Sequence, residues 1–387
     1  MTTNYYDVIV AGAGTMGAAT CSFLAAKGSK VLGFEQFDQV PHENGSHTGQ
    51  SRIIRKAYFE HPDYIPLLQR AYLNWHKLEQ VTSEQVYFKT GLLYCGPSNH
   101  KVIKAVKEAS VNFNIALDNA EGQPCLSAFS RNDDTEVILE HDAGFLLPEK
   151  CISLYIEQAK KNGAVIHTGE KVIEWSRSKG MIKVQTNKCT YSTHKLIITA
   201  GAWADKLINK PALPLKVTRQ VVIWAEPSNP SFYLPEKFPC WLVVDHNLKG
   251  AWYGFPYLSG VQFPGPAGLK FALHYPADET DPDDVKREVT NSELKSIIDV
   301  AGKYFSPAAE KIVAVKTCLY TNSPDENFII DRLHGFEDKV LIACGFSGHG
   351  FKFASVVGEI LADLAADSKT DLPVEFLNIS RFNNLQS

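Results

Sequence analysis

The first 35 residues alternate between apolar runs and a glycine-rich segment. Val8 to Val10 form a short apolar run that predicts a strand, and the alanine-rich stretch after it predicts a helix that ends at Gly28. A second apolar run, "KVLGFE", predicts another strand, which ends at Glu35. Strand, helix and strand in this order are typical of a βαβ unit, so the pattern predicts an α/β fold with a parallel sheet.

Later segments continue this pattern. They predict a helix over about 151–161 that stops at Gly163, followed by strands near Val165 and Val172. A buried strand is predicted in "HKLIITAGAWADKL" and ends at Ala200 and Gly201. The segment "IACGFSGHGFKFASVVGEI" at 342–360 predicts a strand, a glycine-rich turn and a helix that begins near Phe351. We expect these elements to complete the domain that the first 35 residues begin.

Between residues 218 and 324 the pattern changes to short segments of alternating aromatic and β-branched residues. The segments "RQVVIWAEP", "FPCWLVVD", "AWYGFPYL" and "GLKFALHYP" are separated by Gly and Pro, which predicts a mostly antiparallel sheet. We therefore predict two domains. A discontinuous Rossmann-type domain takes residues 1–88, 151–217 and 325–387, and an inserted substrate domain with a mostly antiparallel sheet and some helices takes residues 89–150 and 218–324.

The composition is ordinary for a soluble globular protein of this size. A chain of 387 residues exceeds the length at which one hydrophobic core keeps growing. Its net charge of −4 argues against a nucleic-acid partner, which requires a basic surface. The eight cysteines show no CxxC spacing, so neither a zinc site nor a disulfide scaffold is expected, and a reducing cytoplasm fits best. No apolar run reaches membrane-spanning length, and no signal peptide is expected.

The glycine-rich segment has the spacing of a dinucleotide-binding loop. Gly12 permits the tight turn, Gly14 allows the backbone to approach a pyrophosphate, and Gly17 allows the helix to pack on the strand. Glu35, at the end of the second strand, is placed to accept hydrogen bonds from an adenosine ribose. This loop by itself leaves FAD and NAD open as the cofactor.

Three further motifs carry a resemblance to a known family. At "NGSHTGQSRIIRKAYFEHPDYIPL", "KTCLYTNSPDENFIID" and "GFSGHGFKFASVVGE" the chain resembles the monomeric sarcosine oxidase and N-methyltryptophan oxidase family, and the similarity extends from "YDVIVAGAG" to "ISRF". Members oxidise secondary amino acids to imines and reduce oxygen to hydrogen peroxide, with FAD bound covalently through a cysteine. The resemblance therefore implies FAD rather than NAD, and a small secondary amine and oxygen as the other partners.

The resemblance also implies roles for individual residues. Besides the first loop, the residues implied to bind the cofactor are Thr15, Met16, Ser46, His47, Arg52, Val172, Gly201, Gly345, Gly348, His349, Gly350, Phe351 and Lys352, with Cys318 as the covalent attachment point. Those implied to bind substrate are Arg55, Lys352, Tyr253 and Tyr320. Those implied to take part in catalysis are Lys270, His274, Arg52, Thr48 and Tyr253, and no metal is expected.

The implied roles agree with the chemistry of these side chains. The planar fork of Arg55 suits a carboxylate, and a buried Lys270 could stabilise negative charge developing on oxygen. A cysteine that reacts with flavin needs a nearby cation, for which Arg52, Arg55 and His47 are the candidates. A helix that begins near Phe351 would direct its positive dipole at the flavin's pyrimidine end.

The chain departs from the family's usual "SHHGDTR" motif, because it reads "SHTGQSR". Thr48 replaces a histidine and cannot become cationic, and Gln50 replaces an aspartate. The expected function is oxidation of sarcosine or another N-methyl amino acid by a monomer. The alternatives are a pipecolate or other cyclic imino-acid oxidase, an FAD amine dehydrogenase with a non-oxygen acceptor, a non-catalytic FAD-binding sensor and, more distantly, an NAD-dependent dehydrogenase.

Overall fold

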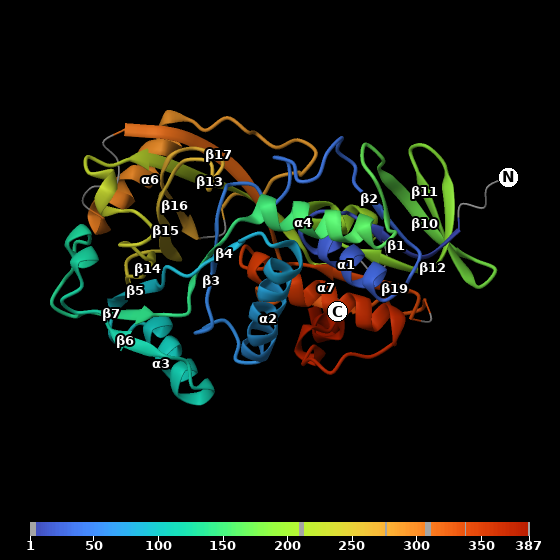
Figure 1. The fold of residues 1–387 in the computed structure, drawn as a ribbon, viewed down its shortest axis with the longest axis horizontal. Helices are drawn as coiled ribbons and strands as arrows, with labels where there is room; N and C mark the ends of the chain where they lie inside the picture. The colour runs from blue at the N-terminus through green and yellow to red at the C-terminus, as the bar shows by residue number, and fades with distance from the viewer. Residues whose placement is uncertain (1–4, 209–212, 275–276, 306–310, 337, 386–387) are drawn as a thin grey trace.

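The computed structural model describes residues 5–208, 213–274, 277–305, 311–336 and 338–385. Figure 1 shows two layered halves, each built on one large sheet, with the amino-terminal strand in one half and the aromatic strands in the other. Seven α-helices within these ranges accompany the sheets: α1 Thr15–Ala26, α2 Tyr64–Thr82, α3 Lys101–Phe113, α4 Pro148–Lys161, α5 Ala204–Leu207, α6 Asn291–Tyr304 and α7 Ala354–Ala366. The 3₁₀ turns are η1 Pro124–Ala128, η2 Gly201–Trp203, η3 Pro230–Phe232, η4 Phe351–Phe353, η5 Glu375–Leu377 and η6 Ile379–Leu385.

The first sheet has a parallel centre. Its strands are β1 Tyr5–Ala11, β2 Val31–Phe34, β9 Val165–His167, β10 Val172–Ser178, β11 Met181–Thr186, β12 Thr190–Ile198, β18 Ile329–Arg332 and β19 Val340–Cys344. Strands β19, β12, β1, β2 and β9 run parallel side by side, whereas β10, β11 and β18 pair antiparallel. This is the Rossmann-type arrangement that the βαβ pattern predicts.

Alternation along β1 explains how this sheet is covered. Val8 and Val10 join the core formed with α1, α4 and α7, whereas Ile9 and Ala11 join a second core on the opposite face with β11 and the carboxyl-terminal segment. Successive side chains of a strand point to opposite faces, so an apolar strand that is buried on both sides has no polar positions. The unbroken apolar run in the sequence therefore corresponds to a central strand.

The second sheet is mostly antiparallel. Its order is β17-β13-β16-β15-β14-β5-β7-β6, and among these neighbours only β14 and β5 are parallel. The strands are β5 Leu92–Pro97, β6 Leu117–Asn119, β7 Thr135–Glu140, β13 Lys216–Glu226, β14 Cys240–Val243, β15 Ala251–Leu258, β16 Gly268–His274 and β17 Lys311–Asn322. The predicted fold class is confirmed, whereas the domain boundaries at residues 88, 150, 217 and 324 remain a prediction.

A small third sheet, with strand order β3-β8-β4, includes Arg52. Its strands are β3 Arg52–Ile54, β4 Tyr87–Phe88 and β8 Gly144–Leu146. Two helix starts differ from the sequence prediction. Helix α4 begins at Pro148 rather than near Cys151, because proline is well tolerated in the first turn. At Phe351 the chain forms one 3₁₀ turn, and the α-helix proper begins at Ala354.

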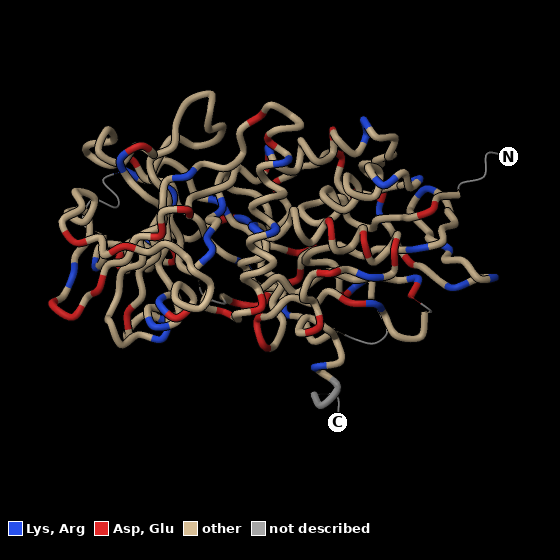
Figure 2. Tube along the Cα trace, turned by 60° about the horizontal axis from the view of Figure 1, so that its bottom comes forward, with Lys and Arg blue, Asp and Glu red and all other residues tan. Residues whose placement is uncertain are grey.

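Lys and Arg are interspersed with Asp and Glu along the trace in Figure 2. None of the α-helices in the part of the chain that the structure describes is long and apolar enough to cross a membrane.

Candidate functional site: a dinucleotide cavity and buried cations

The predicted dinucleotide loop joins β1 to α1. Gly12 has φ +100°, which favours glycine, and a Cβ on Gly17 would lie 1.9 Å from the carbonyl oxygen of Gly12. The Thr199 hydroxyl donates to the same oxygen at 2.7 Å and ties the loop to the end of β12. The two glycines are thus required by the backbone geometry, as the motif predicts.

Glu35 lies at the end of β2 with its carboxylate buried at the wall of a cavity. Its Oε1 accepts from the Phe37 amide at 3.1 Å and lies 3.4 Å from Nε2 of His42. Because an acid at this position can accept hydrogen bonds from a ribose, the location agrees with the role expected for it.

One cavity of about 400 Å³ connects the first loop with the second glycine-rich turn. The predicted site residues that line it are Gly12, Gly14, Thr15, Met16, Glu35, Ser46, His47, Arg52, Val172, Gly201, Tyr320, Gly345, Gly348, Gly350 and Phe351. Gly17 packs behind this wall, and the other predicted residues are not in its lining. A glycine cradle, a terminal acid and a second glycine turn line one cavity, and the first two fit the pyrophosphate and ribose of FAD.

The second turn is held by close contacts that only glycine permits. Gly348 has φ +78°, and a Cβ there would lie 2.2 Å from the ring of Tyr320. A Cβ on Gly350 would lie 2.5 Å from the side chain of Phe346. The 3₁₀ turn η4 follows directly and begins at Phe351 in the cavity wall, so its first backbone N–H groups lie where they suit a group that carries negative charge.

Arg52 organises the loop at residues 46–51. Its guanidinium donates to the carbonyl oxygens of Ser46 at 2.9 Å, Thr48 at 2.6 Å and Ser51 at 2.9 Å. Thr48 therefore holds the guanidinium of Arg52 through its carbonyl oxygen, and its side chain is buried. Arg52 begins β3, whereas Arg55 lies just beyond it and its guanidinium takes different partners.

Lys270 lies on the face of β16 that is turned away from helix α6. Leu269 and Phe271 join the core with α6, whereas Lys270 donates to the Ser51 carbonyl at 2.5 Å and to the Ser51 hydroxyl at 3.3 Å. Its ammonium lies 4.4 Å from the ring centre of Phe255. Burial, and then the charge of Arg52, lowers the pKa of Lys270 well below its ordinary value.

Gln50 has a contact set that an aspartate could not make. Its amide nitrogen donates to the carbonyls of Phe263 at 3.1 Å and Pro266 at 3.2 Å, and its amide oxygen accepts from the Trp224 indole at 2.8 Å. Two donors and an acceptor are used together, and a carboxylate supplies acceptors alone. Gln50 therefore fastens the 259–267 segment beside Lys270, which explains why an amide suits this position.

Cys318 is buried on β17, opposite Gln220 of β13. Burial raises the pKa of its thiol, and the charges of Arg52, Lys270 and Arg287 oppose this rise. Burial first, and the charges of His42 and Arg52 next, lower the pKa of His47 to about 3, which favours Arg52 over His47 as the nearby cation. Arg287 is a further cation near Cys318 that sequence reasoning did not name, because it lies in a segment without a motif. Its Nη2 donates to the Asn44 carbonyl at 3.1 Å, and its Nη1 is buried with no hydrogen-bond partner among the residues that the structure describes.

Arg55 is buried, but its guanidinium is paired within the protein. Nη2 lies 2.7 Å from Oε1 of Glu60, and Nη1 donates to the Ala57 carbonyl at 2.7 Å. The rings of Tyr58 and Phe59 lie 4.3 and 4.1 Å from its central carbon. Burial favours the neutral form, but Glu60 outweighs it and raises the pKa of Arg55. Arg55 is thus a charged, oriented anion site whose present anion is Glu60.

A second carboxylate, Glu140, supports this segment from below. Its side chain is fully buried and accepts from the backbone amides of Lys56 at 2.5 Å and Ala57 at 3.2 Å, and from the Tyr94 hydroxyl at 2.7 Å. Burial raises the pKa of Glu140. Because both amides follow Arg55 directly, Glu140 fixes the backbone from which Arg55 extends.

Lys352 lies close to Arg55 and has a carbonyl as its hydrogen-bond partner. Its ammonium donates to the His349 carbonyl at 2.7 Å and lies 5.2 Å from the ring centre of Tyr58. Burial, and then the charge of Arg55, lowers the pKa of Lys352 to about 7. Two buried cations therefore face one region, which is the arrangement expected for binding a carboxylate.

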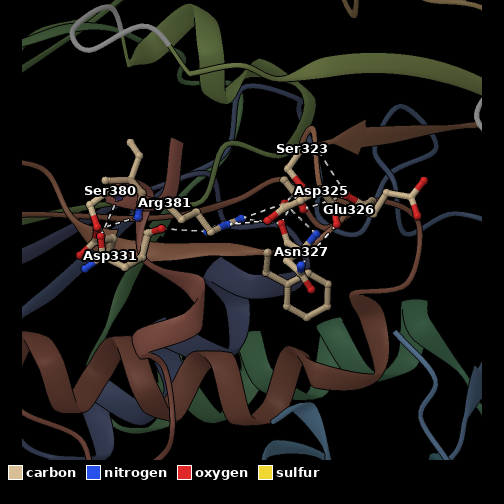
Figure 3. Close-up of polar contacts among 12 residues, drawn as sticks. Ser323, Asp325, Glu326, Asn327, Asp331, Ser380 and Arg381 are labelled. Carbon is tan, nitrogen blue, oxygen red and sulfur yellow. Dashed lines mark hydrogen bonds and ion pairs between the residues drawn. The ribbon is translucent and has the colours of Figure 1, made fainter. Parts of the chain in front are cut away.

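Two contacts orient the ring of His349, and a residue near the carboxyl terminus fixes the turn that provides one of them. Its Nε2 lies 2.9 Å from the Glu326 carbonyl and its Nδ1 contacts the Tyr58 hydroxyl, so Nε2 carries the proton and Nδ1 accepts. Figure 3 shows how the turn around Glu326 is fixed: Arg381 reaches across and binds Asp325 with two nitrogens, at 2.8 and 3.2 Å. Burial lowers the pKa of His349 to about 3, which keeps the ring neutral.

Tyr253, Tyr320 and His274 form a polar group beside Cys318. The two tyrosine hydroxyls share a hydrogen bond, and the Tyr320 hydroxyl lies 3.2 Å from Nδ1 of His274. Burial lowers the pKa of His274 to about 4 and raises that of Tyr253 to about 12. At neutral pH this group is therefore uncharged, so it can orient an amine but holds no cation that would repel it.

Sequence reasoning missed four acidic or basic side chains of the site: Glu60, Glu140, Glu149 and Arg287. Glu60 stands in the quoted motif "RKAYFEHPDY", so the acid five residues after Arg55 was a signal that could have been used. The other three lie in segments without a motif. No group of three or more His, Cys, Asp or Glu side chains that could hold a metal ion is present in the ranges that the structure describes.

A dinucleotide cradle on a parallel sheet, with the buried cations Arg52, Arg55, Lys270 and Lys352 nearby, is the arrangement expected of a dinucleotide-dependent oxidoreductase. A family model described as "FAD dependent oxidoreductase" matches residues 7–364, so the chain belongs to this family and depends on FAD. Among curated relatives, it is 36% identical to "Monomeric sarcosine oxidase" of Bacillus sp. (strain NS-129), with 97% of each chain covered. It is 32% identical to "N-methyl-L-tryptophan oxidase" of Escherichia coli O81 (strain ED1a), with 97% of this chain and 99% of the relative covered.

Solved structures agree with the fold. NikD, described as "an unusual amino acid oxidase", superposes with a TM-score of 0.85 at 21% identity, covering 97% of this chain and 98% of the other. Glycine oxidase from Geobacillus kaustophilus superposes with a TM-score of 0.79 at 16% identity, covering 98% and 99%. The family resemblance and the enzyme class predicted from sequence are confirmed, whereas the role of each site residue and the covalent link to Cys318 remain predictions.

Proposed function

We propose that this flavoenzyme oxidises the C–N bond of a small N-methyl amino acid and passes the electrons to oxygen. The observation that carries this proposal is the pair of buried cations, Arg55 and Lys352, whose charged groups lie 4.3 and 5.2 Å from the ring centre of Tyr58. FAD, when bound, accepts two electrons from the substrate. The imine produced is hydrolysed by water, and oxygen is reduced to hydrogen peroxide.

Each group of residues has one task in this proposal. Arg55 and Lys352 hold the substrate carboxylate, for which Arg55 must exchange Glu60 for the incoming anion. The neutral tyrosines Tyr253 and Tyr320, with His274, orient the amine and exclude water. Lys270 supplies the positive charge that stabilises reduced oxygen in a dry site. Thr48 contributes through its carbonyl, which fixes Arg52.

Cys318 is the residue proposed to hold the flavin covalently. Joining its thiol to a ring methyl group removes two protons and two electrons, which oxygen can accept. The cations that oppose the raised pKa of this thiol, Arg52, Lys270 and Arg287, favour the thiolate that such a reaction requires.

The names of the curated relatives support the N-methyl amino acid reading over a cyclic imino acid, a different acceptor or a non-catalytic sensor. A monomer in the cytoplasm completes the proposal.

The test is anaerobic mixing with sarcosine, N-methyltryptophan or pipecolate while the visible absorption of the flavin is followed. Loss of the flavin band with either N-methyl amino acid, followed by its return and one equivalent of hydrogen peroxide when oxygen is admitted, is the expected result. Bleaching by pipecolate alone would replace the substrate class. Bleaching by an N-methyl amino acid without reoxidation by oxygen would identify a dehydrogenase, and no bleaching by any of the three would reject the proposed function.

A further inference from the structure

The loop at residues 46–51 binds two cations, Arg52 and Lys270, through its backbone carbonyls. Its backbone conformation is nevertheless unfavourable. Gly49 has φ +114° and Gln50 has φ +68°, and a non-glycine residue in the left-handed region is strained. The next carbonyl, that of Ser51, accepts from Lys270 at 2.5 Å and from Arg52 at 2.9 Å. The position of both cations therefore depends on how this turn is held.

The carboxylate of Glu149 binds the backbone of this turn. Its Oε1 accepts the backbone N–H groups of Gly49 at 2.8 Å and Gln50 at 3.1 Å, which are the two residues with positive φ. Glu149 lies in the first turn of α4, where a helix favours an acidic residue, and it reaches the loop across 100 positions of the sequence. A single carboxylate oxygen thus satisfies two amides that the strained turn leaves free.

We propose that Glu149 is a positioning residue for Lys270 and Arg52, which fixes the turn that both cations use and keeps a counter-charge near Lys270. This inference rests on the role proposed for Lys270 in the reaction with oxygen. In this proposal Glu149, whose Oε1 contacts the backbone of Gly49 and Gln50, acts through the loop and through its charge rather than on the reacting atoms.

The negative charge of Glu149 affects the protonation of Lys270. Burial and Arg52 on β3 lower the pKa of Lys270, and the groups that raise it are the Glu149 carboxylate on α4 and then the thiols Cys318 on β17 and Cys240 on β14. A lysine that loses its proton cannot stabilise negative oxygen. Glu149 therefore extends the pH range over which Lys270 remains cationic.

Two substitutions separate geometry from charge. Glu149→Gln keeps an oxygen that can accept both amides but removes the negative charge, whereas Glu149→Ala removes both. Glu157→Gln, on the exposed side of the same helix, is the matched control. Each holoenzyme is reduced by light without substrate and mixed with oxygen across a pH series, and the melting temperature is measured with and without FAD.

In the wild type we expect the reoxidation rate to fall as pH rises through the pKa of Lys270. Glu149→Gln should move this fall to lower pH by about one unit, with a melting temperature near that of wild type. Glu149→Ala should also lower the melting temperature by a few degrees, with or without FAD, because two buried amides lose their acceptor. Glu157→Gln should change neither property.

A Lys270→Met holoenzyme separates the two proposals. If it reoxidises as fast as wild type, the role of Lys270 itself fails. If Lys270→Met is slow but the pH profile of Glu149→Gln coincides with that of wild type, the inference on Glu149's charge is overturned. If Glu149→Ala melts at the wild-type temperature, the inference on the turn is overturned.

Discussion

Nη2 of Arg55 lies 2.7 Å from Oε1 and 2.9 Å from Oε2 of Glu60, so the residue proposed to bind the substrate carboxylate already holds a carboxylate of its own chain. The ligand must compete with Glu60. We therefore expect Glu60→Gln to bind propionate about tenfold more tightly, a gain of ~1.4 kcal/mol, because the competing charge is removed. Propionate affinity can be followed from the change in flavin absorption.

Arg55→Met is the comparison for this prediction. It should weaken propionate binding at least about thirtyfold, because loss of one partner of a buried charge pair costs about 2–5 kcal/mol. Weaker binding by Glu60→Gln would contradict competition and would mean that Glu60 mainly orients Arg55.

Lys352 gives carboxylate binding a pH dependence. Burial and Arg55 lower its pKa to about 7, so the free enzyme loses this positive charge as pH rises above that value. Propionate affinity should fall above pH 7, by at most about tenfold per pH unit, because binding then requires uptake of a proton. Lys352→Met should bind more weakly at pH 6 and show a flat profile between pH 6 and 9. A slope retained in Lys352→Met would assign the titration to another group.

Lys270→Met should separate the two half-reactions. Removal of a buried cation from the oxygen side should slow flavin reoxidation about 10²–10³-fold, the cost of losing one preorganised charge in a dry site. Anaerobic reduction by substrate should change far less, since Lys270 contacts Ser51, whereas Arg55, the proposed carboxylate ligand, contacts Glu60. Stopped-flow absorption measures both rates, and equal losses would reject the assigned role.

Cys318→Ser tests the covalent attachment of FAD. Wild-type protein precipitated with acid and unfolded in denaturant should keep its yellow colour, whereas Cys318→Ser should release all of its FAD to the supernatant. Arg287→Met should slow attachment in apoprotein mixed with FAD, because one cation that lowers the pKa of the thiol is lost. Release of FAD from the wild type would reject the linkage while leaving FAD binding intact.

Buried histidines predict loss of stability in acid. Burial lowers the pKa of both His47 and His349 to about 3, from an ordinary value of 6.5. Between these values the unfolded chain binds protons that the folded protein does not. The contribution of these histidines to the free energy of unfolding is therefore fully present above pH 6.5 and is lost as pH decreases. Each histidine lowers the free energy of unfolding by up to about 1.4 kcal/mol per pH unit.

Urea unfolding at pH 7, 6 and 5 measures this slope. His349→Gln should make it shallower, whereas substitution of the exposed His334 should leave it unchanged. An unchanged slope in His349→Gln would mean that another group carries the proton linkage.

The sequence by itself determined the parts whose physics is local. Glycine spacing in the first loop, the apolar strands around it and the acid at Glu35 fix a dinucleotide cradle, because a tight turn and a helix start depend on neighbouring residues. Alternation along β16 likewise puts Lys270 and Ala272 on one face and Leu269 and Phe271 on the other.

Only the tertiary structure decided which charges meet. Gln50 fastens carbonyls 213 and 216 positions away, and Glu149 reaches Gly49 across 100 positions. The pairing of β5 with β14, and the loss of charge by His47, also depend on segments brought together from distant parts of the chain. No periodicity or motif records such contacts, because the free energy of a buried charge is set by its neighbours in space rather than in sequence.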